Sequence, residues 1–505
     1  MTDLLAPLAA HVQLAAAALL LGLLIALPLT LWASRNARVA QIALGAASLV
    51  QTIPALALLA LFYPILLWLS GWVGGGIPAL GFLPALLALA LYAVLPILRN
   101  GVTGLANLDP AVLEAADGVG MSAGQKLRLV ELPLVAPVLM AGIRTAAVWT
   151  IGAATLSTTV GQPSLGDPIF AGLQTQNWAL VLKGCAAAAG LALVTDMLLA
   201  WAERGIRQRK PRQSWLALAI VFSGVGLSCL PLLHAAPRQV VTIGAKNFSE
   251  QYILARLIGS RLEAAGYTVR YREGLGSAVI YRSLASGDID VYVDYAGTLW
   301  ANEMKRTDIL PPAKMIPAID TWMQRTSGAH VLGSLGFENA YVFAMRSTDA
   351  KARRIATLAD LAQASPQLRL GSDLEFLERP EWKSVKAAYP MAFAQSRAFS
   401  PTFMYRALQS GTVDVISAFS SDGRIAADKL AVLRDPKGAI ARYDALLLLS
   451  PRRAKDDTFA KALRPLIDSI PVEKMQNANY TVDRDSDKLT PQQGAQKLDA
   501  AIRRK

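Results

Sequence analysis

The chain has 505 residues, of which 53% are hydrophobic and 17% are charged, whereas an average soluble domain has roughly 25% charged residues. Residues 1–237 contain 12 Lys and Arg and 8 Asp and Glu, and residues 238–505 contain 38 and 29. A single water-soluble globule and a disordered chain are both excluded, because neither explains a half with so few charges and so many apolar runs. The first half is typical of a membrane domain, and the second of a soluble one.

The net charge of +13 does not indicate nucleic-acid binding. Part of the excess lies in short loops beside apolar runs, where Lys and Arg set the orientation of a membrane protein. The rest is spread over the second half without a basic stripe. Both cysteines, Cys185 and Cys229, lie in apolar segments, so the second half has no disulfide framework and no thiolate metal site.

Six apolar segments are long enough to cross about 30 Å of hydrocarbon, which takes about 20 residues. They lie near 12–33, 42–69, 77–98, 134–156, 179–201 and 215–233. Proline interrupts the second segment at Pro54 and Pro64 and the third at Pro78, Pro84 and Pro96, which helices buried in a bundle tolerate. We expect an all-α polytopic membrane domain over 1–212, with the sixth span in 213–237.

The positive charges predict the orientation of these spans. With the N-terminus outside, the loops around Arg35, Arg99–Arg128 and Arg204–Arg212 lie inside, while the outer loops contain no Lys or Arg. Lys183, at the predicted outer start of the fifth segment, is the one positive charge that does not fit this orientation. The sixth span then delivers the second half to the far side of the membrane. An alternative for 212–236 is a signal peptide, with a basic flank, an apolar run and Leu233-His-Ala235-Ala236; we favour a retained anchor.

The predicted cytoplasmic loop between the third and fourth spans carries a specific motif, Glu114-Ala115-Ala116, then Gly120, then Leu132-Pro133. It resembles the coupling loop of ABC importer permeases. The pattern predicts a short helix, a glycine that breaks it and a second helix that stops before Pro133. The alternative is an ordinary amphipathic connector. No Gly-x-x-x-x-Gly-Lys-Ser/Thr phosphate loop occurs in the chain, so an importer would need a separate ATPase subunit that binds near Glu114.

From Arg238 the pattern alternates between strand and helix: a strand at Val240–Gly244, a helix at Ser249–Ala265 and strands at Thr268–Arg272 and Ile289–Val293. This order favours parallel sheets with crossover helices. An internal repeat matches Tyr281-Arg-Ser-Leu-Ala-Ser-Gly-Asp-Ile-Asp-Val291 with Tyr405-Arg-Ala-Leu-Gln-Ser-Gly-Thr-Val-Asp-Val415.

The repeat predicts two α/β lobes within 238–505. One comprises 238–343 and 447–505, to which the chain returns through Leu446–Leu449, and the other comprises 344–446. Two lobes joined by crossing strands form a hinged cleft that closes on a ligand.

Catalysis in this cleft is poorly supported. His330 is the single histidine of the second half, no metal-ligand cluster stands out, and Asp290, Asp294 and Asp414 at strand ends are more often turn residues or caps than acid–base pairs. We therefore expect binding without chemistry, and neither a metal nor a cofactor.

Five motifs carry the strongest resemblance. They are Gly244-Ala-Lys246-Asn247-Phe-Ser249-Glu-Gln251, Gly287-Asp-Ile-Asp290-Val-Tyr-Val-Asp-Tyr295-Ala-Gly297-Thr298, Gly336-Phe-Glu-Asn339-Ala-Tyr341, Glu375-Phe-Leu-Glu-Arg379 and Ala418-Phe419-Ser-Ser-Asp422-Gly-Arg424-Ile. Together they resemble the binding proteins of glycine betaine, choline and carnitine osmoprotectant ABC importers, one branch of which has the binding domain fused behind the permease. The resemblance implies a two-lobed fold of the periplasmic binding protein kind, type II.

The resemblance also implies the ligand site. In that family a box of aromatic rings holds a quaternary ammonium group and polar donors meet the ligand's carboxylate. Carried over by motif, the rings are Tyr295, Tyr341, Phe419 and Tyr443, and the donors are Lys246, Thr298 and Arg379, with Asn339 and Gln251 as weaker candidates. A trimethylammonium group has no N–H, so ring quadrupoles recognise it where hydrogen bonds cannot, at up to about 2 kcal/mol for each desolvated ring. Each ring alone is more often core packing; Tyr281 and Tyr405 we assign to packing.

Three positions depart from the family pattern. Phe419 replaces a tyrosine, and Val293 and Ala296 replace a proline and a threonine around Tyr295. A larger betaine such as ergothioneine therefore stays an alternative ligand. A membrane sensor is a second class of function, which the lack of a kinase, cyclase or helical signalling extension disfavours, and an enzyme is a third.

The resemblance implies a multi-pass transporter subunit of the inner (cytoplasmic) membrane, with its C-terminal domain on the periplasmic side. The partners that it implies are an ABC ATPase subunit at the coupling loop, a second copy of the permease and a small quaternary ammonium ligand.

Overall fold

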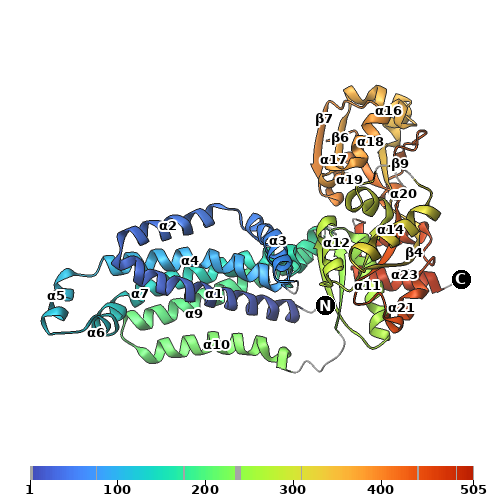
Figure 1. The fold of residues 1–505 in the computed structure, drawn as a ribbon. Helices are drawn as coiled ribbons and strands as arrows, with labels where there is room; N and C mark the ends of the chain where they lie inside the picture. Colours follow the sequence, from blue (N-terminus) through green and yellow to red (C-terminus); the bar gives the residue numbers. More distant parts are fainter. Residues whose placement is uncertain are drawn as a thin grey trace. The chain divides into compact units, whose positions relative to one another are not determined.

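The computed structural model describes residues 4–74, 77–174, 177–233, 240–306, 308, 310–440, 443–484 and 486–503. It divides into two compact units, residues 1–170 with 179–236 and residues 171–178 with 237–505 (Figure 1). His234, Ala235 and Ala236 of the alternative export signal lie outside the described residues.

The N-terminal part is all helical, as predicted. Its helices are α1 (Leu5–Arg35), α2 (Ala37–Thr52), α3 (Ala55–Trp72), α4 (Phe82–Ala106), α5 (Pro110–Gly118), α6 (Ala123–Lys126), α7 (Leu132–Ala154), α8 (Gly166–Gln174), α9 (Trp178–Arg207) and α10 (Pro211–Leu233). Within the described residues, six helical segments are long and apolar enough to cross a membrane: Leu5–Arg35, Ala55–Trp72, Phe82–Ala106, Ala123–Val160, Trp178–Arg207 and Pro211–Leu230.

The second predicted span, 42–69, is not one helix. The chain leaves the helix at Ile53, whose ψ is 126°, and α3 begins after Pro54. The cause is local, because a proline disfavours the α conformation of the preceding residue. Pro64, by contrast, lies inside α3. The span therefore consists of α3, preceded by the separate helix α2.

Small residues allow α1, α4 and α7 to pack closely. A Cβ atom added to Gly101 of α4 would stand 2.5 Å from Thr30 Cγ2 of α1, and one added to Gly142 of α7 would stand 2.7 Å from the carbonyl oxygen of Pro96 in α4. Close backbone approach at glycine is the usual way in which membrane helices gain packing contacts, since lipid provides no hydrophobic drive for association. α4 is accordingly the most buried of the spanning helices.

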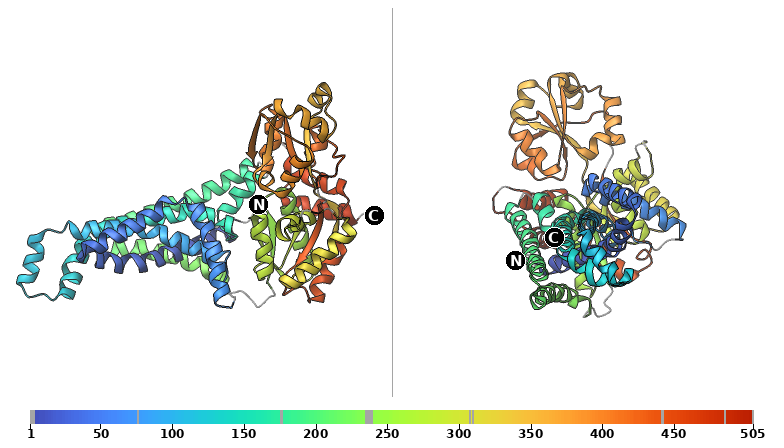
Figure 2. Two further views of the ribbon diagram at one scale, coloured as in Figure 1. Left: turned by 45° about the horizontal axis from the view of Figure 1, so that its top comes forward. Right: turned by 90° about the vertical axis from the view of Figure 1, so that its left-hand side faces the viewer.

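The C-terminal unit contains two five-stranded sheets, one in each lobe (Figure 2). The first sheet has the order β2 (Thr268–Leu275), β1 (Val240–Lys246), β3 (Val291–Tyr295), β10 (Asp444–Leu449), β4 (His330–Glu338). The second has the order β7 (Gln395–Phe399), β6 (Arg369–Asp373), β8 (Val415–Phe419), β5 (Tyr341–Arg346), β9 (Leu430–Val432). The predicted limits 343 and 446 lie inside β5 and β10.

The helices of this unit complete the two α/β lobes. They are α11 (Ser249–Ala264), α12 (Ser277–Ser286), α13 (Ala296–Thr298), α14 (Pro312–Thr326), α15 (Ser347–Arg353), α16 (Leu358–Ala364), α17 (Leu374–Glu378), α18 (Pro380–Ala388), α19 (Pro401–Gln409), α20 (Arg424–Ala427), α21 (Asp457–Leu463), α22 (Val472–Asp483) and α23 (Pro491–Arg503).

The sheets are mixed, which corrects the expectation of parallel sheets. β1 pairs in parallel with β2 and β3, and β6 with β7 and β8, as the strand–helix alternation predicts. β10 runs antiparallel to β3 and β4, and β5 antiparallel to β8 and β9. These two strands follow directly on the crossings between the lobes, so each enters its sheet from the opposite direction. The crossings lie between β4 and β5 and between β9 and β10.

The internal repeat has the same structure in both lobes. α12 and α19 are followed by Gly287 (φ 80°) and Gly411 (φ 73°) in the left-handed conformation, and then by β3 and β8. Asp290 accepts a 2.8 Å hydrogen bond from the Thr242 amide, and Asp414 accepts one of 2.9 Å from the Arg369 amide. The two carboxylates thus tie neighbouring strands together, a structural role that differs from the turn residue or cap that we expected.

Candidate functional site

Four predicted rings lie where the chain crosses between the lobes. Tyr341 begins β5 and pairs with Phe419, the last residue of β8, while Tyr295 ends β3 and Tyr443 precedes β10. The backbone N–H of Asn339 donates a 2.9 Å hydrogen bond to the Tyr443 carbonyl, so the two crossing segments run side by side. Because strand ends of both sheets meet at this hinge, residues more than a hundred positions apart come together.

Tyr341 is the centre of the aromatic cluster. Its ring centroid lies 5.0 Å from that of Phe419 and 5.8 Å from that of Tyr443, the latter nearly perpendicular at 88°. Tyr295 joins through Phe248, whose ring is 6.2 Å from Tyr295 and 6.1 Å from Phe419, with the two Phe planes 5° apart. The aromatic faces therefore form one continuous group.

Sequence reasoning missed two members of this cluster, Phe248 and Phe376. Phe376, in α17, lies 4.6 Å from Tyr341. Both occur inside motifs that carried the family resemblance, 244–251 and 375–379, so a signal was present in the sequence. Phe248 comes two residues after β1 and Phe376 three residues after β6, but the resemblance assigned the aromatic box mostly to tyrosines and implied neither of them.

The tyrosine hydroxyl of Tyr295 is fully engaged within the protein. It donates a 2.6 Å hydrogen bond to Glu250 Oε1 and accepts one of 2.9 Å from Gln251 Nε2. Burial, and after it the nearby Glu250 carboxylate, raise the pKa of Tyr295 well above its ordinary value. The phenol therefore stays protonated, and the ring has a fixed orientation.

Glu250 is a buried carboxylate that the sequence did not single out. Besides Tyr295, Asn339 Nδ2 (3.1 Å) and Asn479 Nδ2 (2.9 Å) donate to it. Burial raises its pKa, and hydrogen bonds from Ser421, Tyr295, Asn479 and Asn339 act in the opposite direction. Asn479 lies in α22, 229 residues away in sequence, so no local pattern links the two. Of the two weaker donor candidates, Asn339 bonds Glu250 and Gln251 bonds Tyr295.

The predicted donor Lys246 forms a buried ion pair. Its Nζ lies 2.5 Å from Asp294 Oδ1 and 5.3 Å from the centroid of the Tyr295 ring. Asp294 also accepts a 2.6 Å hydrogen bond from the Tyr292 hydroxyl. Lys246 is thus part of the site, with its charge neutralised by Asp294.

Arg379 and Thr298 meet across the two lobes. Arg379 Nη2 lies 3.4 Å from Thr298 Oγ1, and the guanidinium carbon lies 5.4 Å from the centroid of Tyr341. Both side chains are buried. A guanidinium offers several N–H donors in a planar fork, which suits a carboxylate. All nine predicted ligand residues are therefore connected through the cluster, and their contact with a ligand stays a prediction.

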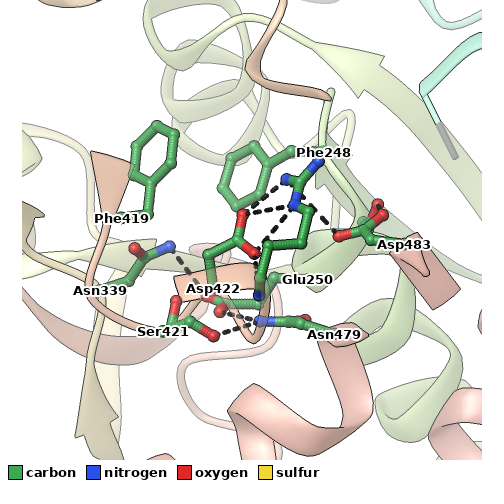
Figure 3. Close-up of a pocket in the computed structure, with 10 residues that line it drawn as sticks. Phe248, Glu250, Asn339, Phe419, Ser421, Asp422, Asn479 and Asp483 are labelled. Atoms are coloured by element: carbon green, nitrogen blue, oxygen red, sulfur yellow. Dashed lines mark hydrogen bonds and ion pairs between the residues drawn. The ribbon is translucent and has the colours of Figure 1, made fainter. Parts of the chain in front are cut away.

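A small polar pocket opens beside Phe248 and Phe419 (Figure 3). Its volume is about 30 Å³, and its lining residues are Phe248, Ser249, Glu250, Asn339, Phe419, Ser421, Asp422, Arg424, Asn479 and Asp483. Arg424 Nη2 lies 2.6 Å from Asp422 and 3.8 Å from Asp483. Burial raises the pKa of Asp483 to about 6, against the attraction of Arg424.

The tyrosines that the repeat assigned to packing are buried in separate cores. Tyr281 stacks on Trp322 at 5.5 Å in the first lobe. Tyr405 belongs to the core of the second lobe, with the Arg424 guanidinium 4.0 Å from its ring centroid. Among the described residues, no group of three or more His, Cys, Asp or Glu is placed to hold a metal ion.

The predicted coupling loop lies at one end of the helical part (Figure 1). Asp109 caps α5, Glu114 and Ala115 are exposed, Ala116 is buried, and Gly120 has a φ of 77°. A capping box at Ser122 starts the second helix.

That second helix does not stop before Pro133, which corrects our expectation. It runs through a π-helical turn (Leu127–Glu131) into α7, with Leu132 and Pro133 both exposed. The wide turn places Pro133 in the first turn of α7, where a proline without N–H is tolerated.

Comparison with known proteins identifies both parts of the chain. Residues 239–499 match the family described as the substrate-binding domain of ABC-type glycine betaine transport systems, and residues 18–208 match the inner membrane component of binding-protein-dependent transport systems. The chain belongs to the family of ABC importers for glycine betaine and related compounds, whose substrate-binding domain matches half of the chain. It is an ABC importer permease fused to its substrate-binding domain, as the resemblance implied. The permease family and the six long apolar helices among the described residues make it a multi-pass protein of the inner membrane.

Individual relatives of this importer fit one or both parts. The ergothioneine transport permease/ergothioneine binding protein of Helicobacter pylori (strain G27) is 28% identical over 464 residues, 89% of this chain and 81% of the relative. The choline transport system permease protein of Bacillus subtilis (strain 168) is 41% identical over 194 residues, 38% of this chain and 84% of the relative. A solved glycine betaine/carnitine/choline ABC transporter is 27% identical, with a TM-score of 0.45 over 52% of this chain and 98% of that chain.

Proposed function

We propose that this importer takes up a small quaternary ammonium compound, such as glycine betaine, choline, carnitine or a relative. One observation carries the proposal: rings from both lobes, Tyr295, Tyr341, Phe419 and Tyr443, gather at the hinge. Ring faces attract a cation that has no hydrogen to donate. Arg379 and Thr298 supply donors for a carboxylate at the same place. The names of the relatives support the same class of ligand.

Ligand entry requires the lobes to move. The side chains of Tyr295, Tyr341 and Tyr443 are buried. The adjoining pocket beside Phe419, of about 30 Å³, holds only water-sized groups, which need at least about 10–15 Å³ each. A trimethylammonium group is several times larger, so we infer that the lobes separate at the crossings 339–340 and 443, admit the ligand and close over it. With hinged closure of this kind, the binding domain has one shape with ligand and another without it, so the permease can distinguish the two states.

The energy comes, in this proposal, from a separate ATPase subunit that docks on the loop around Glu114. The exposed apolar side chains Val119, Leu129 and Leu132, which follow Glu114 in the chain, support a docking role for this region. In this proposal a second copy of the permease completes the transporter. The positive charges of the predicted inner loops support a binding domain on the periplasmic side.

Ergothioneine is the second candidate ligand. The relative that spans 89% of this chain carries that name. The pocket beside the stacked rings of Phe248 and Phe419 is lined by the carboxylates of Glu250, Asp422 and Asp483, which accept hydrogen bonds. The ring N–H groups of ergothioneine can donate there, whereas glycine betaine has no N–H.

The test is calorimetry on the full chain in lipid nanodiscs with glycine betaine, choline, carnitine and ergothioneine. We expect saturable binding of at least one of them, and loss of binding when Tyr295→Ala is combined with Tyr443→Ala. The matched control is Tyr281→Phe, a buried aromatic change away from the cluster, which should bind like the wild type. Unchanged affinity in the double variant contradicts the aromatic site. An associated signalling protein in place of an ATPase after purification would favour a sensor.

A further inference from the structure

We propose that Glu250 is a positioning residue for cation recognition, which orients the Tyr295 ring and increases the electron density on its face. This inference rests on the proposed function, because it explains how one ring of the cluster attracts a quaternary ammonium group. Glu250 itself makes no contact with the cation in this scheme; it acts through the Tyr295 hydroxyl.

The hydrogen bonds around Glu250 favour its ionised form. The Tyr295 hydroxyl (2.6 Å), Asn339 Nδ2 (3.1 Å) and Asn479 Nδ2 (2.9 Å) all act as donors to its two oxygens. A carboxylate accepts from all three donors and from the Ser421 hydroxyl, whereas a protonated carboxyl group would have to give up at least one of these bonds and direct its own O–H to the Ser421 oxygen. Ionised Glu250 is therefore the form that fits its surroundings, although burial works against the charge.

The same contacts fix the ring. Because Gln251 donates to the Tyr295 oxygen and Tyr295 donates to Glu250, the hydroxyl is held from two sides. Both partners are neighbours on α11, so one helix N-terminus positions the hydroxyl. Tyr295 is buried, and its ring faces Phe248. The ring thus has one orientation before any ligand arrives, and binding costs less side-chain entropy.

A hydrogen bond from a phenol to an anion changes the ring electronically. The proton is drawn toward the carboxylate, and electron density shifts onto the oxygen and the ring, so the negative face of the quadrupole becomes stronger. Lys246, at 5.3 Å from the ring centroid, already shows that this ring lies beside a cation. Phe419, by contrast, has no hydroxyl and cannot be tuned in this way.

Glu250 also connects the ring to the second lobe. Asn479 Nδ2, which donates to Glu250, donates as well to the Ser421 carbonyl at 2.9 Å, in the loop after β8. Next to it, Gln476 Nε2 donates to the Ser420 carbonyl at 2.9 Å. Separation of the lobes would break these two bonds and the hydrogen bond between Ser421 and Glu250. Tyr295, Asn339 and Asn479 belong to the same lobe as Glu250 and would stay bonded to it, so the Tyr295 ring keeps its electrostatic partner when the lobes open.

The experiment compares ligands that carry a quaternary nitrogen with isosteres that lack its positive charge, on the full chain in nanodiscs. Two pairs serve: glycine betaine with 3,3-dimethylbutanoate, and choline with 3,3-dimethyl-1-butanol, in which carbon replaces the quaternary nitrogen. The quantity measured is the ratio of the two affinities. For the pair that wild type binds, we expect Glu250→Gln to lower this ratio about tenfold, within the range of a cation–π contact. Tyr295→Phe, which keeps the ring, should lower it similarly, and the double variant no further.

Tyr292→Phe is the matched control. Its hydroxyl also donates to a buried carboxylate, Asp294, at 2.6 Å, but its ring lies in the core of the first lobe. The ratio should stay as in the wild type. An affinity ratio that is unchanged in both Glu250→Gln and Tyr295→Phe overturns this inference alone. So does an equal loss of affinity for a ligand and its isostere, because a residue that only supports the structure would give that result. If Glu250→Gln does not fold, the affinity ratio measured for Tyr295→Phe tests the inference instead. A wild type that binds none of glycine betaine, choline, carnitine and ergothioneine overturns the proposed function as well.

Discussion

Arg379 Nη2 of the second lobe lies 3.4 Å from Thr298 Oγ1 of the first, with both side chains buried. A ligand carboxylate placed between the lobes would accept from both. We predict that Arg379→Ala weakens glycine betaine binding by at least about tenfold, because a hydrogen bond to a charged group contributes roughly 1.5–3 kcal/mol. Choline, which has no carboxylate, should lose less than about threefold. Competition binding with the two ligands measures the difference. An equal loss for both would show that Arg379 only supports the fold.

Phe419 stands where the family pattern has a tyrosine, and variants at this position test what the difference does to ligand binding. Its ring is 5.0 Å from Tyr341 and parallel to Phe248. We predict that Phe419→Tyr changes the affinity for choline by less than about threefold, because the π face is retained, whereas Phe419→Leu lowers it by up to about thirtyfold, the equivalent of about 2 kcal/mol. Titration calorimetry gives both values. If leucine binds as well as phenylalanine, the ring contributes no cation–π attraction.

The sequence predicted the architecture well where periodicity and composition decide it. The apolar segments, the strand–helix alternation and the Tyr281–Val291 repeat are local patterns, and they led to six spanning helices and two lobes. Local rules also explain the main error in the membrane part, because Pro54 acts on Ile53 next to it. The π turn before Leu132 has no such signature and was missed.

The site was predictable only in part, for a physical reason. Tyr295, Tyr341 and Phe419 lie in the sequence motifs that carry the family resemblance, so the resemblance implied them, and all three end or begin strands that meet at the hinge. Glu250 and Asn479 come from two helices that pack only in the folded domain, and no spacing links them. Lys246 was expected to meet a carboxylate on the ligand, but the structure supplies one from β3, Asp294. Partners of buried charges depend on the three-dimensional packing of the whole unit.

The buried pair of Lys246 and Asp294 should contribute to folding. Asp294→Asn leaves the ammonium group of Lys246 without a counter-charge in a buried place, which typically costs about 3–5 kcal/mol. We predict a clearly lower midpoint in thermal unfolding of the C-terminal unit, followed by tryptophan fluorescence on the full chain. The control is Arg306→Ala, which breaks an exposed pair with Asp308 and should leave the midpoint nearly unchanged. A wild-type midpoint for Asp294→Asn would mean that water or another group compensates Lys246.

Asp483 predicts a pH dependence of stability. Its pKa in the folded protein is about 6, above the ordinary 3.8, chiefly because of burial. Between about pH 4 and pH 6 the folded state therefore binds more protons than the unfolded state, so this group makes the free energy of unfolding fall as the pH rises, by at most about 1.4 kcal/mol per pH unit. Asp483→Asn removes this decline. Unfolding curves from pH 4 to pH 7 should show the variant gaining stability relative to the wild type up to about pH 6, and a constant difference would contradict the raised pKa.

Glu114 offers a test of energy coupling that is separate from ligand binding. The side chain is exposed on α5, so its replacement should not disturb the fold. We predict that Glu114→Arg lowers ligand-stimulated ATP hydrolysis and uptake by at least about tenfold, because a charge reversal at a docked surface places like charges together at a cost of several kcal/mol. Ligand affinity of the binding domain should be unchanged.

Asp117→Asn, one turn further along α5, is the matched control for this loop. Asp117 lies 2.8 Å from Lys126 and bonds within the loop itself, so its loss should affect uptake little. The two variants separate a docking contact from general loop stability: if both lower uptake equally, the loop is only a structural connector, and if neither does, the ATPase docks elsewhere. A loss confined to Glu114→Arg, restored by the reciprocal charge change on the ATPase, would place the contact at this side chain.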